Sequence, residues 1–141
     1  MSKSFKETLN LLKDSNLEDF SKYTFRGIEK ESLRVSGTTI SETDHPKSLG
    51  STLTNQFITT DFSEALLELI TKKQNSIDAS LGQLEDVLSY VYLNCDEIIW
   101  PSSVPCAIEN ENQIRIAEYG STNSGRLKNL YRKGLSERYG S

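Results

Sequence analysis

Two short apolar stretches of this chain carry acidic residues at positions where a globular protein normally packs its core. The stretches are residues 25–35 and 58–71. The acidic residues they contain are Glu29, Glu31, Asp61 and Glu68. Carboxylates are rarely buried without a partner, and several brought close together repel one another unless a cation lies between them. A fold that joins these stretches therefore raises the question of a divalent metal and, through the metal, of a phosphate substrate.

Residues 25–35 alternate in the manner of a β-strand. Period-two alternation places Glu29 and Glu31 on the same face as Leu33 and Val35, with the two carboxylates about 7 Å apart along the strand. Sharing a face with apolar residues argues against full exposure, although two solvated glutamates remain the alternative. Oxygen ligands without a neighbouring Cys or His suit Mg²⁺ or Mn²⁺ rather than zinc.

The second stretch has two readings. Asp61 and Glu64 have the spacing of a capping box, which would start a helix with Asp61, Glu64 and Glu68 on one solvated face. Residues 66–71 can equally form a strand that is buried on both sides. Periodicity does not decide between them, and we favour a turn at Asp61 followed by a strand.

The remaining pattern predicts mixed α and β structure. The predicted elements are a helix at 3–13, a short turn at 17–23, a hairpin turn at 36–39 returning through Ile40, a helix starting at Asn75 or Ser76, a weak strand at 113–117, and a last helix after the loop 119–125. The second helix carries a stripe that we expect to pack in the core: Ile77, Leu81, Leu84, Leu88 and Val91.

Size and charge exclude several classes of protein. A chain of 141 residues fits one domain, and its net charge of −4 argues against a nucleic-acid binder. No apolar run approaches the length of a membrane span and the first residues lack a signal peptide's apolar core, so we expect a cytoplasmic location with no membrane partner. Cys95 and Cys106 have no metal-ligand spacing and are expected to be reduced, and His45 is expected at the surface.

A series of sequence blocks, taken together, resembles the proteobacterial-type glutamate–cysteine ligases, also called γ-glutamylcysteine synthetases. The blocks are residues 26–35, 45–51, 59–71, 100–102 with 105–106, 119–126, 131–135 and 138–140. Each block alone is weakly specific. Their shared order, from about Thr24 onward, makes the resemblance specific.

The resemblance implies an α+β fold, part of a glutamine-synthetase-like curved antiparallel sheet with flanking helices. It also implies that residues 1–141 are a single N-terminal segment of a larger catalytic domain, incomplete in this chain. Family members continue into a strand that carries an active-site histidine and into later nucleotide-binding basic residues.

The implied reaction is the ATP-dependent ligation of the γ-carboxylate of L-glutamate to L-cysteine, the first step of glutathione biosynthesis. It proceeds through γ-glutamyl phosphate and requires Mg²⁺ or Mn²⁺. By position, the resemblance implies that Glu29, Glu31 and Glu68 bind the metal. It also implies that Asp61 lies beside the amine of the cysteine substrate and that Arg132 neutralises a substrate carboxylate. The pocket for the cysteine side chain would be lined by Phe62, Tyr131 and Leu135.

The 141 residues alone are expected to have little or no ligase activity. The alternative function is a non-catalytic acidic module that binds Mg²⁺ or a partner chain, and a further alternative is that the carboxylates are merely solvated. An exposed sheet edge predicts association with the missing C-terminal part of the ligase or with a second copy.

Overall fold

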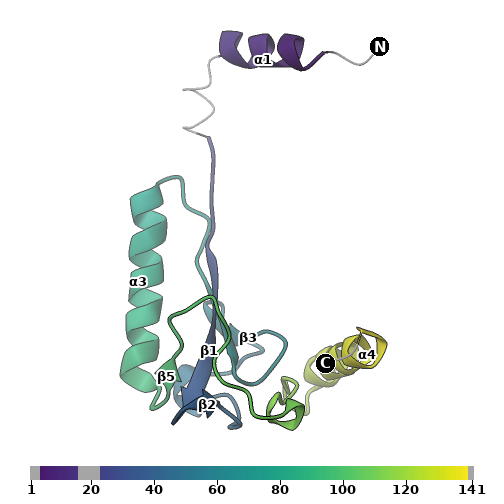
Figure 1. Cartoon of the computed structure of the whole chain (residues 1–141). Helices are drawn as coiled ribbons and strands as arrows, with labels where there is room; N and C mark the ends of the chain where they lie inside the picture. Colours follow the sequence, from purple (N-terminus) through teal and green to yellow (C-terminus); the bar gives the residue numbers. More distant parts are fainter. Residues whose placement is uncertain (1–3, 16–22, 140–141) are drawn as a thin grey trace.

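In the computed structural model, residues 4–15 and 23–139 are described, without the side chains of 135–139. Helix α1 (Phe5–Asp14) confirms the first predicted helix. It begins in a capping box, because the Ser4 hydroxyl accepts a hydrogen bond from Glu7 N–H and the Glu7 carboxylate accepts one from Ser4 N–H. No side chain of α1 is buried, and Figure 1 shows this helix apart from the sheet. The turn predicted at 17–23 lies almost entirely outside the described residues.

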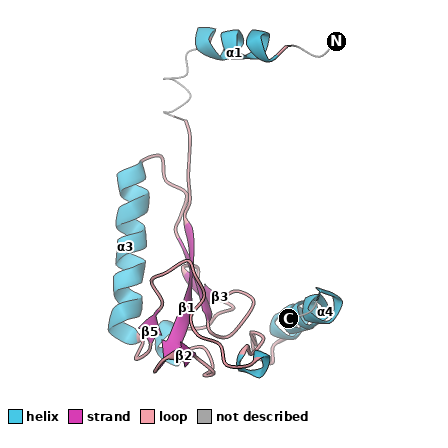
Figure 2. Ribbon diagram, viewed as in Figure 1, coloured by secondary structure: helices cyan, strands magenta, loops and turns pink. Residues whose placement is uncertain are grey.

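The described strands form one antiparallel sheet around β1 (Glu29–Ser36). The other strands are β2 (Thr39–Ile40), β3 (Ile58–Thr60), β4 (Leu66–Ile70) and β5 (Ile98–Ile99). Their order is β2-β1-β4-β3, and β5 pairs with the last part of β1. Figure 2 shows the labelled strands β1, β2, β3 and β5 gathered beside α3. These strands confirm the predicted first strand and the hairpin return through Ile40. They also confirm the reading that we favoured for the second stretch, a turn at Asp61 followed by a strand.

The register of β1 and β4 places two acidic residues side by side. Glu31 lies directly opposite Glu68. The hydrogen bonds to β4 come from even-numbered residues, since Ile28 C=O accepts from Thr71 N–H at 2.9 Å and Arg34 N–H donates to Ala65 C=O at 2.8 Å. Glu31 and Glu68 are therefore a non-hydrogen-bonded pair, in which Cα atoms are about 4.5 Å apart and side chains are closest.

Helix α3 (Ile77–Asn94) covers one face of the sheet and begins at the predicted cap, Ser76. The core beneath it consists of Leu49, Ile58, Leu67, Leu69, Val91, Cys95 and Ile99, with Phe57, Leu84, Val87 and Leu88 packed against it. The predicted stripe is wrong at its start, because Ile77 and Leu81 are 60% and 51% exposed. The helix spans about 27 Å and the five residues of β4 about 17 Å, so the first turns of α3 extend past the strand.

A second, smaller core lies at the far end of β1. It contains Val35, Ile40, Ala65 and Cys106, with Leu33 and Trp100 against it. Both cysteines are free, as expected, and both are buried. The sheet remains open beside the first half of β1: in the described chain, β5 reaches only Arg34 and Val35, and no strand pairs with Glu29 to Ser32 on the edge away from β4.

The strand predicted at 113–117 is wrong. A short 3₁₀ helix, η2 (Glu111–Gln113), occupies its beginning, and a single bridge joins Ile116 to Ser63. The buried Gln113 side chain accepts a hydrogen bond from Glu109 N–H at 2.7 Å, which fixes a local turn in place of a ladder. The last predicted helix is confirmed as α4 (Asn123–Tyr139). Within the described ranges, no helix is long and apolar enough to cross a membrane.

Candidate functional site on the open face of the sheet

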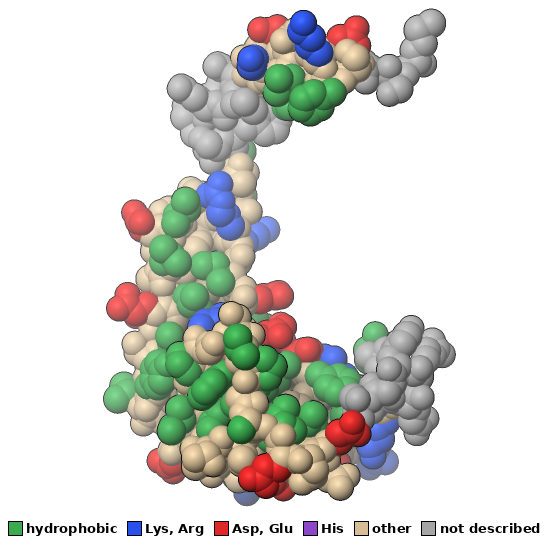
Figure 3. Space-filling model, viewed as in Figure 1, with side chains coloured by type: hydrophobic (Ala, Val, Ile, Leu, Met, Phe, Trp, Pro, Cys, Tyr) green, Lys and Arg blue, Asp and Glu red, His purple; other side chains and the backbone are tan. Residues whose placement is uncertain are grey.

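Three predicted metal ligands lie together on the face of the sheet opposite α3. Glu29 and Glu31 of β1 are exposed, and Glu68 of β4 is half-buried. Thr59 of β3 pairs with Glu68 on its other side, so this row of residues crosses three strands. Figure 3 shows acidic side chains along the side of the sheet away from α3.

The four carboxylates form one electrostatic group. Burial raises the pKa of Glu68, and the charges of Asp61, Glu29 and Glu31 raise it further, while Lys128 opposes them. In the described part of the chain, no group of three or more Asp, Glu, His or Cys side chains is already arranged to hold a metal ion. The carboxylates thus act on one another through their charges, but three of them do not yet converge on one point, and a cation would have to draw them together.

Asp61 lies in the tight turn between β3 and β4, where its N–H donates to Leu66 C=O at 3.0 Å. Its carboxylate accepts a hydrogen bond from Arg132 of α4 and forms an ion pair with it. Burial would lower the pKa of Arg132, but its hydrogen bond to Asp61 contributes to a net rise. The structure thus joins the two residues to which the resemblance assigns substrate contacts.

Tyr119 anchors α4 beside this pair. Its ring is buried, and its hydroxyl lies 3.0 Å from Thr60 C=O and 2.6 Å from Asp61 C=O. Asn129 accepts a hydrogen bond from Tyr119 N–H at 2.7 Å, and Lys128 Nζ lies 3.9 Å from the centroid of the ring. Helix α4 therefore reaches the acidic face through polar and charged contacts.

The close approach of α4 depends on Gly125. A Cβ atom at this position would lie 2.3 Å from Tyr119 C=O and 2.6 Å from Gly120 C=O. Such contacts are far inside normal van der Waals separation. The glycine thus permits the first turn of α4 to pack directly on the preceding loop.

A buried polar frame supports the turn that carries Asp61, and sequence reasoning missed it. Glu64, 3% exposed, accepts hydrogen bonds from His45 N–H at 2.8 Å and Glu118 N–H at 2.6 Å. The sequence pattern places Glu64 only in a possible capping box and on the solvated face of the helix that it would start. The signal that could have found it is its place in a run of apolar residues, where a carboxylate needs buried donors.

Arg34 completes this frame. Its guanidinium is fully buried, donates to Thr43 C=O and Glu64 C=O at 2.8 Å each, and pairs with the Glu97 carboxylate. His45 is not the surface residue expected from the sequence. Burial lowers the pKa of His45 to about 4, and the charge of Arg34 lowers it too.

No pocket of the described residues is lined by both Phe62 and Tyr131, two of the three residues predicted to contact the cysteine side chain. Phe62 is half-buried in the turn after Asp61, and its C=O accepts from Ala117 N–H at 3.0 Å. Tyr131 is 63% exposed on α4 and lines a shallow depression with Leu127 and Leu130, to which Phe62 does not contribute. The side chain of Leu135 lies outside the described residues.

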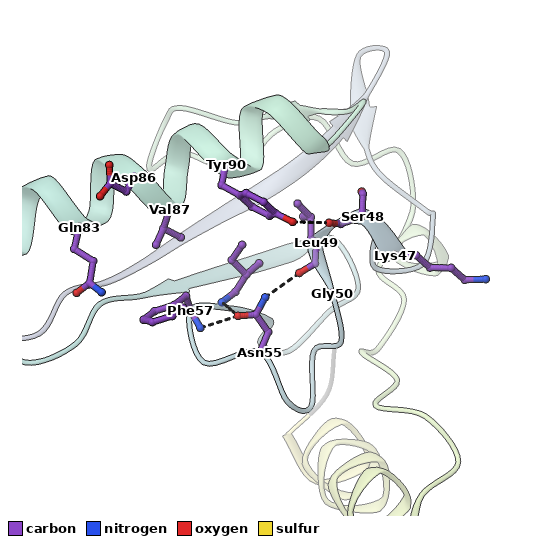
Figure 4. Close-up of a pocket in the computed structure, with 11 residues that line it drawn as sticks. Lys47, Ser48, Leu49, Gly50, Asn55, Phe57, Gln83, Asp86, Val87 and Tyr90 are labelled. Carbon is purple, nitrogen blue, oxygen red and sulfur yellow. Dashed lines mark hydrogen bonds between the residues drawn. The ribbon is translucent and has the colours of Figure 1, made fainter.

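A separate pocket of about 520 Å³ lies between α3 and residues 47–58 (Figure 4). Its polar groups are used within the fold: the Tyr90 hydroxyl donates to Ser48 C=O at 3.0 Å, and the Asn55 amide donates to Leu49 C=O at 2.9 Å. None of the predicted site residues lines it.

Two solved structures are similar in fold to this chain. A crystal structure of glutamate–cysteine ligase from Francisella tularensis in complex with AMP matches with a TM-score of 0.77 and 50% identity, over 82% of this chain and 24% of that one. A bifunctional glutathione synthetase from Pasteurella multocida matches with a TM-score of 0.69 and 32% identity, over 81% of this chain and 15% of that one. The predicted α+β fold class is thereby confirmed.

The relatives found by sequence include further glutamate–cysteine ligases. Glutamate–cysteine ligase from Vibrio vulnificus (strain CMCP6) is 52% identical over 118 residues, which is 82% of this chain and 22% of the relative. The enzyme from Aliivibrio fischeri (strain MJ11) is 49% identical over 129 residues, 90% of this chain and 25% of the relative. This chain thus spans about a quarter of the length of these relatives. The family model for glutamate-cysteine ligase matches residues 9–141, and the chain belongs to that family.

Proposed function

We propose that Glu29, Glu31 and Glu68 bind Mg²⁺ or Mn²⁺ in the site of an ATP-dependent glutamate–cysteine ligase. The observation that carries this proposal is the direct opposition of Glu31 and Glu68 on the open face of the sheet. Like charges directly opposite each other across two strands destabilise a sheet, so their presence requires a compensating partner. A hard divalent cation provides that compensation.

The residues fit such a cation in charge and in donor chemistry. All are carboxylates, and the raised pKa of Glu68 reflects its burial and the charges of its acidic neighbours. Mg²⁺ commonly takes a few carboxylates and completes its shell with water and substrate phosphates. When bound, the metal would neutralise charge on the phosphoryl oxygens of ATP as the γ-carboxylate of glutamate is activated.

The pair of Asp61 and Arg132 fits an amino acid substrate such as cysteine. An α-amino acid carries an ammonium and a carboxylate, which match an acidic and a basic side chain held side by side. In the present structure the two side chains pair with each other through one nitrogen and one oxygen, and the buried Arg132 Nε has no partner among the described residues. Binding would exchange this ion pair for two ion pairs with the substrate, and Phe62, Tyr131 and Leu135 would contact its side chain.

Residues 1–141 would serve as one segment of a larger catalytic domain. The unpaired edge of β1 and the exposed Leu127 and Leu130 of α4 support association with further chain, either the rest of such a ligase or a second copy. Sedimentation at several protein concentrations tests this association, and a monomer at every concentration would contradict self-association.

Metal binding is tested by titrating the chain with Mn²⁺ and following free Mn²⁺ by electron paramagnetic resonance. We expect Glu31→Gln and Glu68→Gln to weaken binding by about tenfold or more, because each removes a charged ligand. The matched control is Glu85→Gln on the exposed side of α3. Equal binding by all these proteins would overturn the metal site.

The alternative function for residues 1–141 by themselves is a non-catalytic Mg²⁺-binding or interaction module, since they span about a quarter of the relatives' length. An assay for γ-glutamylcysteine and ADP separates the two for the 141-residue chain. We expect little or no turnover, with Mn²⁺ binding retained. Turnover comparable to a full-length ligase would show that this segment suffices for the reaction.

A further inference from the structure

Among the described residues, Lys128 is a basic group that acts on Glu68 of the acidic face and whose ammonium has no assigned ligand. Its Nζ lies 3.9 Å from the centroid of the Tyr119 ring, and its side chain is half-buried. Its two polar neighbours on α4 are already engaged, since Arg132 pairs with Asp61 and Asn129 accepts from Tyr119 N–H. Among the described residues, no acceptor forms a hydrogen bond with the Lys128 ammonium.

The charges around Lys128 depend on whether a cation is bound. Four carboxylates and two basic side chains leave the acidic face with a net charge of about −2. Burial, and then the charge of Arg132, lower the pKa of Lys128, while the charges of Glu68 and Asp61 partly oppose this shift. One divalent cation would bring the net charge to about zero and a second would make it positive. An anion that is repelled from the bare face would then be attracted to it.

The Tyr119 ring holds Lys128 in place for such an anion. Tyr119 is itself fixed by its hydroxyl, which donates to the backbone of Thr60 and Asp61. A cation over an aromatic ring is attracted by the ring face, while the three N–H donors of the ammonium remain free to bind other groups. Partial burial strengthens any charge interaction formed there.

We propose that Lys128 binds the carboxylate or phosphate group of a ligand that reaches the acidic face together with a divalent cation. This proposal rests on the proposed metal site. A compact ammonium suits either anion, because it acts as a point charge rather than as a bidentate fork.

Three variants separate this role from a purely structural one. Lys128→Met keeps an aliphatic stem over Tyr119 without the charge, and Lys128→Arg keeps the charge. Lys133→Met is the matched control, because Lys133 lies on the same helix and is exposed. Backbone amide signals of α4 report whether the helix remains docked in each variant.

The experiment uses the Mn²⁺-loaded chain and measures relaxation enhancement of ³¹P in inorganic phosphate and of ¹³C in carboxyl-labelled acetate. We expect enhancement in the wild-type chain, in Lys128→Arg and in Lys133→Met, and a loss of about tenfold in Lys128→Met. Loss of the phosphate effect alone assigns Lys128 to phosphate, and loss of the acetate effect alone assigns it to carboxylate. Equal enhancement in Lys128→Met and Lys133→Met would overturn the proposal while leaving the metal site intact.

A second measurement in the wild-type chain does not depend on how Lys128→Met folds. With Mg²⁺ present, the ¹³Cε signal of Lys128, assigned by its absence from Lys128→Arg, should shift on addition of the binding anion, whereas that of Lys133 should not. An unshifted Lys128 signal contradicts the proposal. Absence of Mn²⁺ binding to the wild-type chain would instead overturn the proposed function on which it rests.

Discussion

The two long helices of this chain contact the same sheet in opposite ways. Helix α3 packs its apolar residues Leu84, Val87, Leu88 and Val91 on one face. Helix α4 reaches the opposite side through Lys128, Asn129 and Arg132, and leaves Leu127, Leu130 and Tyr131 more than 60% exposed. One face of the sheet is thus an apolar core, whereas the other carries the carboxylates that α4 borders and, at the far end of β1, the smaller second core.

This difference follows from the residues of β1 and β4. Leu67 and Leu69 point to α3 and are 1% exposed, whereas Glu31 and Glu68 occupy the alternate positions on the other face. An apolar helix face could cover those carboxylates only by desolvating them. Separating the two faces lets one stabilise the fold while the other keeps its charges accessible to a ligand.

The largest expected effect comes from the core beneath α3. Leu69→Ala should reduce the free energy of unfolding by about 3 kcal/mol, because it removes buried methyl groups and leaves a cavity. Urea unfolding followed by circular dichroism measures this loss. The control Leu93→Ala alters an α3 residue that is 85% exposed and should change stability by less than about 0.5 kcal/mol. Similar losses in both variants would mean that α3 does not pack as described.

The next effect concerns the attachment of α4. Gly125→Ala should displace the first turn of the helix, since the new Cβ would lie 2.3 Å from Tyr119 C=O. We expect a cost of about 2 kcal/mol, typical of overpacking, and a shifted Tyr119 amide signal as its bond to Asn129 is lost. The control is Gly134→Ala, where the added Cβ meets nothing within 4 Å among the described residues beyond its own stretch of helix. An unchanged Tyr119 signal in Gly125→Ala would contradict the close packing.

Local alternation allowed the acidic strand to be predicted from the sequence. The period-two pattern predicts which residues of β1 share a face, whereas periodicity does not decide between the turn at Asp61, which we favour, and a capped helix. The stripe on α3 identified the packing side but not its extent, because the length of the partner strand is a tertiary property. Sequence periodicity therefore predicts faces better than it predicts how far two elements overlap.

The polar contacts of the site could not be predicted in the same way. Arg34 bonds to Glu64, 30 positions away, and Arg132 bonds to Asp61, 71 positions away. No local spacing reports such pairs, because chain folding brings them together. The resemblance named Asp61 and Arg132 as separate substrate contacts, and the structure adds that they hold each other.

A smaller effect tests the polar frame that supports the acidic face. His45 has a pKa of about 4 in the fold, below its ordinary 6.5, so its contribution to stability is present above 6.5 and is lost as the pH falls toward 4. His45→Gln lacks this titration. Between about pH 7 and pH 5, the wild-type chain should lose about 1 kcal/mol more than the variant, after allowing for partial exposure of the ring. Parallel pH profiles in urea unfolding would show that His45 titrates normally.

The smallest effect is a difference between the two helices in how amide exchange responds to salt. The ion pair of Asp61 and Arg132 is partly exposed, so it should contribute about 0.5 kcal/mol at low ionic strength, and about 1 M NaCl should screen most of it. Exchange of the Tyr119 amide, which depends on α4 through Asn129, should therefore quicken with salt in the wild-type chain and respond less in Asp61→Asn. Exchange of the amides in the second half of α3 should not become faster, because salt does not screen apolar burial. Asp86→Asn on that helix is the matched control. A salt response shared equally by α3 and α4 would mean that the two helices do not differ in what holds them to the sheet.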